Sequence, residues 1–180
     1  MTKQSIQLSI KLTTVADPSS LAFNILSDLA FISKPYVPMT VVLDHFNLEE
    51  GTLYSVPGKV RGAISRHGTE YVLGINPNLS SAEQRLELGW LLSWFLHTNI
   101  RDLIPDNYTV HHVAGAGNPD VISFNDRFAS SLLVHHIPER VVKRLIKDTK
   151  GTYTSKYARK RLVPTRILLN RLADSITVEF

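Results

Sequence analysis

The sequence is organised around the stretch Ser80–His97, which reads SSAEQRLELGWLLSWFLH. Ser80 followed by Glu83 is a capping box, a pattern typical of a helix N-terminus because the two residues satisfy two free backbone N–H groups. Trp90 and Trp94, four residues apart, share one face of the predicted helix. Apolar residues cover its other sides, at Leu86, Leu88, Leu91, Leu92, Phe95 and Leu96. We therefore expect a long central helix that is buried on several sides.

Length and composition limit the classes of protein to which the chain can belong. A chain of 180 residues is long enough for one domain with a sizeable core. The absence of cysteine excludes a disulfide scaffold and thiolate metal sites, and it fits a reducing compartment. No apolar run reaches the roughly 18–20 residues of a membrane-spanning helix, and the N-terminus does not read as a signal segment. We expect a cytoplasmic protein without a membrane partner.

The formal net charge of +4 is unevenly distributed along the chain. Residues 1–137 contain nine Lys or Arg against twelve Asp or Glu. Residues 138–171 contain eleven Lys or Arg against two Asp or Glu. The positive charge therefore belongs to one segment near the C-terminus. We expect a single domain over residues 1–180, with a core over 1–137 and a basic helical part over 138–172.

Periodicity and chain breakers predict the other elements. Helices are expected at about 18–30, 40–46, 121–135, 139–148 and 164–172. Segments 60–65 and 70–75 flank His67-Gly68 and predict a β-hairpin. Residues 105–120 are rich in loop formers. Alternation over 5–12, and again at Ile176, Val178 and Phe180, predicts two strands that pair the termini.

The central helix resembles the helix that carries His-Glu-x-x-His in the ImmA/IrrE family of zinc metallopeptidases. In that family an Arg-x-x-Leu run precedes the motif, and Arg85 and Leu88 match this run. Trp90 and Trp94 then fall on the two zinc-binding histidine positions, and Leu91 falls on the catalytic glutamate position. Trp offers one N–H donor and Leu offers none, so neither residue type binds zinc or transfers a proton.

Further local patterns extend the resemblance over roughly residues 38–172. They are Gly62-Ala63-Ile64, Tyr71 to Asn76, Asn125 to Leu133, and Val163 to Leu172. The family places its third zinc ligand, a glutamate, where this chain has Ile122. The resemblance implies an α+β, mainly helical, zincin-like peptidase scaffold, with a small antiparallel sheet beside a buried central helix.

The resemblance also implies a function. Active members of the family cut transcriptional repressors of mobile elements or stress regulons. A member without ligands is expected to be a non-catalytic pseudo-metallopeptidase with no catalytic residue, metal or cofactor. It would act in gene regulation by binding a protein partner, such as a transcriptional repressor of a phage or mobile element. An active metallopeptidase with displaced ligands is a further alternative, and the oligomeric state stays open.

The seven histidines are candidate ligands for a metal site elsewhere in the chain: His45, His67, His97, His111, His112, His135 and His136. None of these histidines stands four residues from another, the spacing that places two ligands on one helix face. We interpret them as surface or capping histidines. His97 fits this interpretation because a cation is favoured at a helix C-terminus.

The basic segment carries the main positive signal for binding. Arg140, Lys143, Arg144 and Lys147 follow one another at i, i+3, i+4 and i+7, which places them on one helix face. After a turn come Lys156, Arg159, Lys160 and Arg161. A solvated face, an acidic protein partner and nucleic-acid phosphates each fit this pattern. A nucleic-acid-binding regulator is therefore the alternative function. The segment contains no evident helix that would read base edges, so the pattern does not predict sequence-specific recognition.

Overall fold

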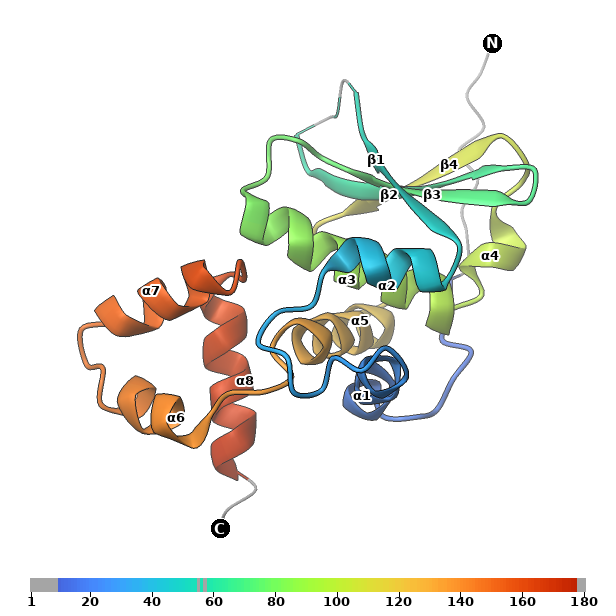
Figure 1. Cartoon of the computed structure of the whole chain (residues 1–180). Coiled ribbons are helices and arrows are strands. Elements are labelled where there is room, and N and C mark those ends of the chain that lie inside the picture. The colour runs from blue at the N-terminus through green and yellow to red at the C-terminus, as the bar shows by residue number, and fades with distance from the viewer. Residues whose placement is uncertain (1–9, 55, 57, 178–180) are drawn as a thin grey trace.

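The computed structural model describes residues 10–54, 56 and 58–177, with side chains as far as residue 173. Its fold is mixed α+β, as expected (Figure 1). The helices are α1 Pro18–Asp28, α2 Met39–His45, α3 Ser81–His97, α4 Ile100–Leu103, α5 Pro119–Leu133, α6 Glu139–Ile146, α7 Thr152–Lys160 and α8 Thr165–Thr177. The strands are β1 Leu48–Thr52, β2 Val60–His67, β3 Glu70–Ile75 and β4 Tyr108–Val113.

Helix α3 is the centre of the molecule, and its N-terminus lies where the sequence predicted it. The Ser80 hydroxyl accepts the Glu83 backbone N–H at 3.3 Å, which satisfies one free donor of the first turn. The Glu83 carboxylate instead accepts hydrogen bonds from Arg61 and Arg166. Every residue from Arg85 to Phe95 is buried. The prediction of a central helix enclosed on several sides is therefore confirmed.

Two glycines let the layers on either side of α3 come close. The sheet packs on one side of the helix and α5 packs on the other, with α1 against the far side of α5 (Figure 1). A Cβ atom added to Gly62 of β2 would lie 2.8 Å from Leu91 Cδ1. A Cβ atom added to Gly89 of α3 would lie 3.2 Å from the Ala129 Cβ of α5. Side chains at these positions would push the sheet and α5 away from the central helix.

The sheet is mixed, so the expectation of an antiparallel sheet is wrong. Its strand order is β1-β3-β2-β4, with β1 parallel to β3 and the other two pairs antiparallel. The predicted hairpin of β2 and β3 is present, with Gly68 at φ +62° in the turn. Strand β1 does not pair with β2, the next strand in sequence. It lies along the outer side of β3, and the pair is parallel because the chain reverses direction between β1 and β2 and again between β2 and β3.

Four elements, β1, α4, β4 and α7, lie where the sequence predicted no helix or strand. Residues 108–113, expected as loop, form β4, whose backbone is held by pairing with β2 forty or more residues earlier. Helix α7 follows Gly151, which has φ +68°, a conformation that favours glycine. The Asp148 carboxylate accepts the backbone N–H and the hydroxyl of Thr154, and these bonds hold the start of α7.

The expected pairing of the chain termini is not what the described residues show. Ile176 belongs to helix α8, so the C-terminal strand is wrong at that residue, and Val178 and Phe180 lie outside the described residues. Of the predicted N-terminal strand, residues 5–9 also lie outside them. Leu12 forms an isolated antiparallel bridge with Thr98. The described start of the chain therefore pairs beside the C-terminal end of α3.

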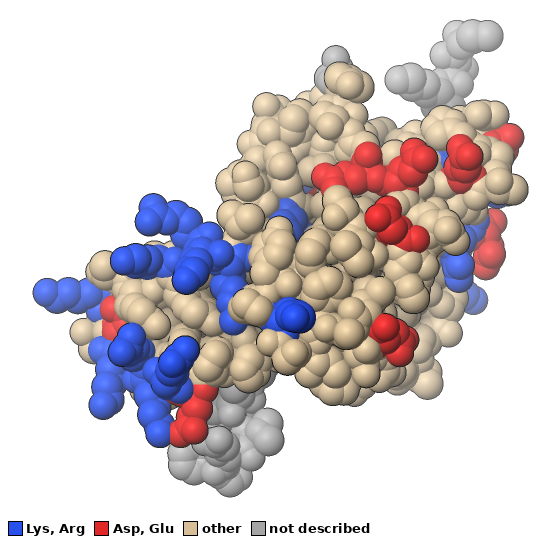
Figure 2. Space-filling view, viewed as in Figure 1, with Lys and Arg blue, Asp and Glu red and all other residues tan. Residues whose placement is uncertain are grey.

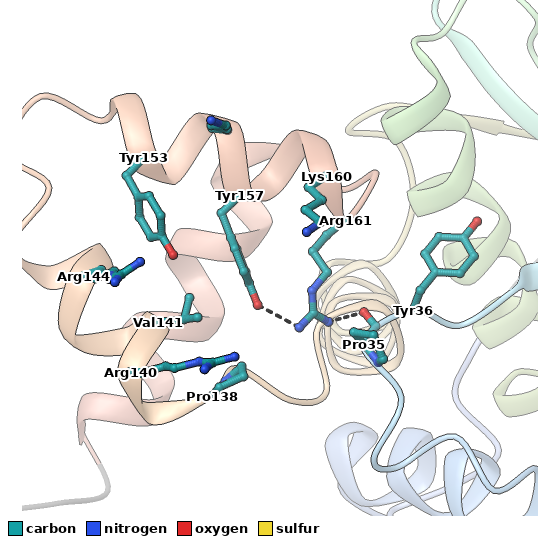
Figure 3. Close-up of a pocket in the computed structure, with 11 residues that line it drawn as sticks. Pro35, Tyr36, Pro138, Arg140, Val141, Arg144, Tyr153, Tyr157, Lys160 and Arg161 are labelled. Atoms are coloured by element: carbon teal, nitrogen blue, oxygen red, sulfur yellow. Dashed lines mark hydrogen bonds between the residues drawn. The ribbon is translucent and has the colours of Figure 1, made fainter.

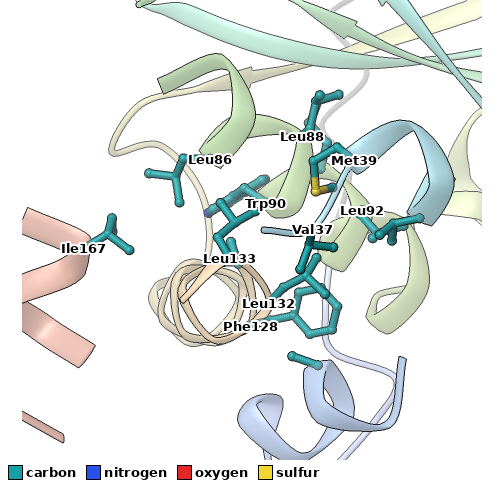
Figure 4. Packing of buried hydrophobic residues seen from close by; sticks show 14 of the residues in the cluster. Val37, Met39, Leu86, Leu88, Trp90, Leu92, Phe128, Leu132, Leu133 and Ile167 are labelled. Carbon is teal, nitrogen blue, oxygen red and sulfur yellow. The ribbon is translucent and has the colours of Figure 1, made fainter. Parts of the chain in front are cut away.

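One hydrophobic core joins α1, α2, α3, α5 and the sheet (Figure 4). Leu91, Leu92, Phe128 and Leu132 are each completely buried in it. Helix α8 reaches the same core through Ile167 and Leu168 and packs on α5 and α7. Helices α6 and α7 extend to one side, and this arrangement sets the basic C-terminal part beside the core (Figure 1).

Candidate functional site

The four residues that the resemblance singles out lie on two helices, with Trp90, Leu91 and Trp94 on α3 and Ile122 on α5. Trp90 and Trp94 are each 5% exposed, and their rings meet edge to face at 5.4 Å between centroids. Leu91 is completely buried and faces Gly62 of the sheet. Ile122 of α5 is half-buried and lines the same small cavity as Trp90. The structure thus brings Trp90 and Ile122 together, while Leu91 faces the sheet.

We call this space the central cavity. Its volume is about 170 Å³, and its lining residues are Arg61, Leu86, Glu87, Trp90, His112, Ala114, Gly115, Ile122, Asp126 and Arg166. The imidazole of His112 stacks on Trp90, with ring centroids 3.7 Å apart and planes 9° from parallel. The cavity is smaller than the roughly 300–1,000 Å³ of sites that enclose small-molecule ligands.

The basic groups that line the central cavity, Arg61, His112 and Arg166, are paired with carboxylates of α3. The Glu87 carboxylate, whose side chain is 2% exposed, accepts hydrogen bonds from Arg61 Nε at 3.0 Å and from His112 Nδ1 at 2.5 Å. Glu83 binds Arg61 and, at 2.5 Å, Arg166. This network ties β2, β4 and α8 to the central helix. Its cations are consequently engaged by carboxylates of the protein.

The pKa values of two carboxyl groups respond to this environment. Partial burial acts to raise the pKa of Glu83, but hydrogen bonds from Arg166 and Arg61 and their charges outweigh it, so its pKa lies below the usual value. Partial burial raises the pKa of Asp126, although a hydrogen bond from the Trp90 indole opposes this effect. Within residues 10–54, 56 and 58–177, no three His, Asp or Glu side chains lie close enough to hold a metal ion.

Two histidines are not at the surface, so the interpretation of surface and capping histidines is wrong for them. His112 is 8% exposed, and its ring lies between Glu87 and Trp90. His97 packs against Phe124 and Phe128 of α5. Burial, with the nearby charge of Arg101, lowers the pKa of His97 to about 4, so it is neutral rather than a capping cation. Glu87 lies within an otherwise apolar helix, and a buried carboxylate requires a polar partner. This residue was therefore the feature of the sequence that could have indicated the burial of a histidine beside it.

A second and larger depression lies between α6, α7 and the segment before α2, and we call it the basic cleft (Figure 3). Its volume is about 650 Å³. Its lining residues are Pro35, Tyr36, Pro138, Arg140, Val141, Arg144, Tyr153, Lys156, Tyr157, Lys160 and Arg161. Five of these residues are cations and none is Asp or Glu. On the visible face, Lys and Arg gather over this C-terminal part (Figure 2).

The basic cleft collects five of the eight predicted binding residues: Arg140, Arg144, Lys156, Lys160 and Arg161. The other three, Lys143, Lys147 and Arg159, are exposed but do not line it. Lys143 pairs with Glu139 at 2.5 Å, one turn earlier on α6. The basic residues of α6 were predicted to share one face, but only Arg140 and Arg144 line the cleft. They do so because α7 packs beside this part of α6.

Arg161 supports the wall of the cleft from within. It is 7% exposed, and its guanidinium donates to the carbonyls of Pro35 and His136 and, at 2.7 Å, to the hydroxyl of Tyr157. These bonds orient the Tyr157 ring and join α7 to two separate loops. Arg161 therefore adds charge to the cleft, while its terminal N–H groups are used by the protein.

Arg85 holds the same region against the central helix. Its guanidinium donates to the carbonyls of Arg161 and Val37, each at 2.7 Å, and lies 4.2 Å from the centroid of the Tyr36 ring. Burial lowers its pKa to about 10, so it remains charged at neutral pH. The basic cleft is consequently fixed to α3 by a buried cation.

Two tyrosines of α7, Tyr153 and Tyr157, form another part of the cleft lining. They were not among the binding residues predicted from the sequence. Tyr153 and Tyr157 are half-buried, with ring centroids 6.3 Å apart and planes 27° from parallel. They alternate on α7 with Lys156 and Lys160 at i, i+3, i+4 and i+7, so all four side chains share one face. This alternation of Tyr and Lys was the signal available in the sequence.

Comparison of the chain with models of known protein families and with curated protein sequences finds no match. Among the helices of the described chain, none has the length and apolar character required to cross a membrane.

Proposed function

We propose that this chain is a non-catalytic regulatory protein that binds nucleic acid through the basic cleft. The observation that carries the proposal is that four cations of the cleft are exposed and, among the described residues, unpaired: Arg140, Arg144, Lys156 and Lys160. They are exposed, they face a lining without a carboxylate, and no described residue pairs with them. Cations left free in a concave site attract phosphates and release the counterions that surround nucleic acid.

The non-catalytic part of the proposal rests on the central helix. Trp90, Leu91, Trp94 and Ile122 stand at the positions that resemble a metallopeptidase motif, and none of these side chains binds zinc or transfers a proton. The aromatic and apolar side chains fill space on both sides of α3. We propose that the chain retains a zincin-like scaffold for stability, with its binding function transferred to the C-terminal part.

A protein partner, such as a transcriptional repressor of a phage or mobile element, is the second candidate. Apolar side chains at the edge of the cleft favour it, because such surface is typical of protein interfaces. Tyr36 is 41% exposed and Leu162 is 38% exposed, and both line a neighbouring depression. An acidic segment of such a protein would complement the same cations.

Fluorescence anisotropy with labelled oligonucleotides of mixed sequence, at several salt concentrations, tests the proposal. The cleft variant combines Arg144→Glu, Lys156→Glu and Lys160→Glu. The matched control combines Lys147→Glu, Lys150→Glu and Arg159→Glu, which make the same change of charge on residues that do not line the cleft. We expect the cleft variant to lose binding and the control to retain most of the wild-type affinity.

The salt dependence adds a second criterion. Each phosphate contact should contribute a slope of about −0.9 for duplex DNA, or about −0.7 for a single strand, to a plot of log affinity against log salt concentration. Equal losses in the two variants would show that general surface charge, and not the cleft, causes binding. If no nucleic acid binds but a nuclease-treated cell extract yields a protein that depends on the cleft residues, the second candidate replaces the first.

A further inference from the structure

We infer that the basic cleft receives a single strand of nucleic acid, with bases stacked on Tyr153 and Tyr157 and phosphates held by the surrounding cations. This inference rests on the proposed function and specifies its ligand. It follows from the combination of aromatic rings and free cations within one concave site. Proteins that bind single strands without sequence preference combine a positively charged groove with aromatic side chains on which bases stack.

The first step is the arrangement of side chains on α7. Tyr153 and Tyr157 lie one turn apart, and Lys156 and Lys160 lie beside them on the same face. A strand that follows this face meets a ring and a cation at each turn of the helix. Aromatic and positive groups thus alternate along α7, as bases and phosphates alternate along a nucleic-acid chain.

The second step is the opposite wall, which belongs to α6. Arg140 and Arg144 stand four residues apart and face the tyrosines across the cleft (Figure 3). Phosphates can therefore be held on both sides of a base that lies on the rings. The cleft volume of about 650 Å³ is within the range of sites that enclose small-molecule ligands.

The third step is the fixed orientation of Tyr157. Its hydroxyl accepts a hydrogen bond from Arg161 at 2.7 Å, and the Arg161 guanidinium lies 5.2 Å from the ring centroid. Arg161 is itself anchored by the carbonyls of Pro35 and His136. A ring held in this way requires little ordering when a base stacks on it, so less binding free energy is lost.

The fourth step separates single strands from duplexes. In a duplex the bases stack on one another, and the phosphates form the convex outer surface. A duplex can place phosphates at the cationic rim, but it cannot place a base face on rings that lie inside a concave cleft. A single strand can turn its bases outward, so it alone uses both parts of the lining.

The test compares a labelled single strand of mixed sequence with a duplex of the same length at one salt concentration. The wild-type protein should bind the single strand more tightly than the duplex. Tyr153→Leu and Tyr157→Leu, each of which removes a ring but keeps apolar bulk, should weaken single-strand binding by about 5- to 150-fold. They should leave duplex binding nearly unchanged, and Tyr153→Phe should retain single-strand binding.

A ligand variant makes the test independent of any folding defect in the Leu variants. An abasic strand with the same phosphates should bind the wild-type protein at least as weakly as the normal strand binds either single Leu variant. Equal or tighter duplex binding, insensitive to the tyrosines, would overturn the inference while leaving the proposed function in place. Absence of binding to either nucleic acid, or equally tight binding of poly-aspartate, would overturn both.

Discussion

The imidazole of His112 lies flat on the indole of Trp90, with ring centroids 3.7 Å apart and ring planes 9° from parallel. Glu87, one turn before Trp90 on α3, accepts the hydrogen bond from His112 Nδ1 that fixes this orientation. Trp94 contacts the same indole at an edge, and Asp126 of α5 lines the same cavity as Trp90. Trp90 therefore connects the sheet, the central helix and α5 through one side chain.

Replacement of either tryptophan should destabilise the fold. Trp90→Ala and Trp94→Ala should each lower the free energy of unfolding by about 3–5 kcal/mol, because a large buried side chain is lost and a cavity remains. Chemical denaturation measures this change, and Phe23→Ala, at a side chain that is 52% exposed, is the control. A tryptophan variant that unfolds like the wild type, yet loses partner binding, would show that the ring is an exposed anchor.

Introduction of a zinc-peptidase motif into α3 should not create peptidase activity. The triple variant Trp90→His, Leu91→Glu, Trp94→His places polar groups in an apolar interior, where they lack ready partners. Leu91 is completely buried, so the glutamate is the most costly of the three changes. We expect a lower melting temperature and no cleavage of a general protein substrate in the presence of zinc. Zinc-dependent cleavage by this variant would contradict the prediction.

The wild-type protein should hold no stoichiometric zinc. The proposed resemblance aligns the zinc-ligand and catalytic positions of a metallopeptidase with Trp90, Leu91, Trp94 and Ile122, none of which coordinates a metal. A chelator should leave the melting temperature unchanged, because only a ligand bound to the native state raises it. Elemental analysis of the purified protein measures the metal content directly. One tightly bound zinc ion per chain would support the alternative of a metallopeptidase with displaced ligands.

Stability should depend on pH through His97. Burial lowers its pKa from 6.5 to about 4 in the folded protein, so the unfolded chain takes up the proton first as the pH falls. The contribution of neutral His97 is complete above pH 6.5 and is lost progressively as the pH falls towards 4. The loss should be below about 3 kcal/mol, because solvent reaches part of the ring and screens its charge.

His97→Leu is the matched variant for this pH dependence, because the Nε2 atom of His97 is buried without a hydrogen-bond partner among the described residues. Denaturation of both proteins across this pH range gives the difference in their stabilities, in which the other titrating groups largely cancel. The wild type should lose stability relative to the Leu variant as the pH falls. A difference that stays constant with pH would contradict the low pKa of His97.

Arg85 should be required for stability. Arg85→Ala removes the donors to the carbonyls of Val37 and Arg161 and should cost about 2–4 kcal/mol. Arg85→Lys keeps the charge but cannot reach both carbonyls with one ammonium group, so it should recover only part of this loss. Thermal unfolding of both variants within the error of the wild type would refute this role.

Local chemistry was enough to predict the elements that depend on residues close in sequence. The Ser80 cap and the apolar run after it specified α3, and Gly68 specified the turn between β2 and β3. Both signals act over a few residues, through backbone hydrogen bonds and allowed φ values. The uneven charge of the chain likewise located the basic segment, because net charge adds along a sequence without reference to folding.

Tertiary structure decided the partners of these elements. Strand β4 exists through its pairing with β2. Strand β1 lies beside β3 instead of β2, and the pair is parallel because the chain reverses direction twice between them. His112 meets Glu87, 25 residues away in sequence, only after the sheet packs on α3. Arg161 reaches Pro35, 126 residues away in sequence, and thereby closes one side of the basic cleft. Such pairs form between distant segments. The local pattern of apolar and polar residues does not specify which distant surface a side chain will face, so these contacts could not be predicted from it.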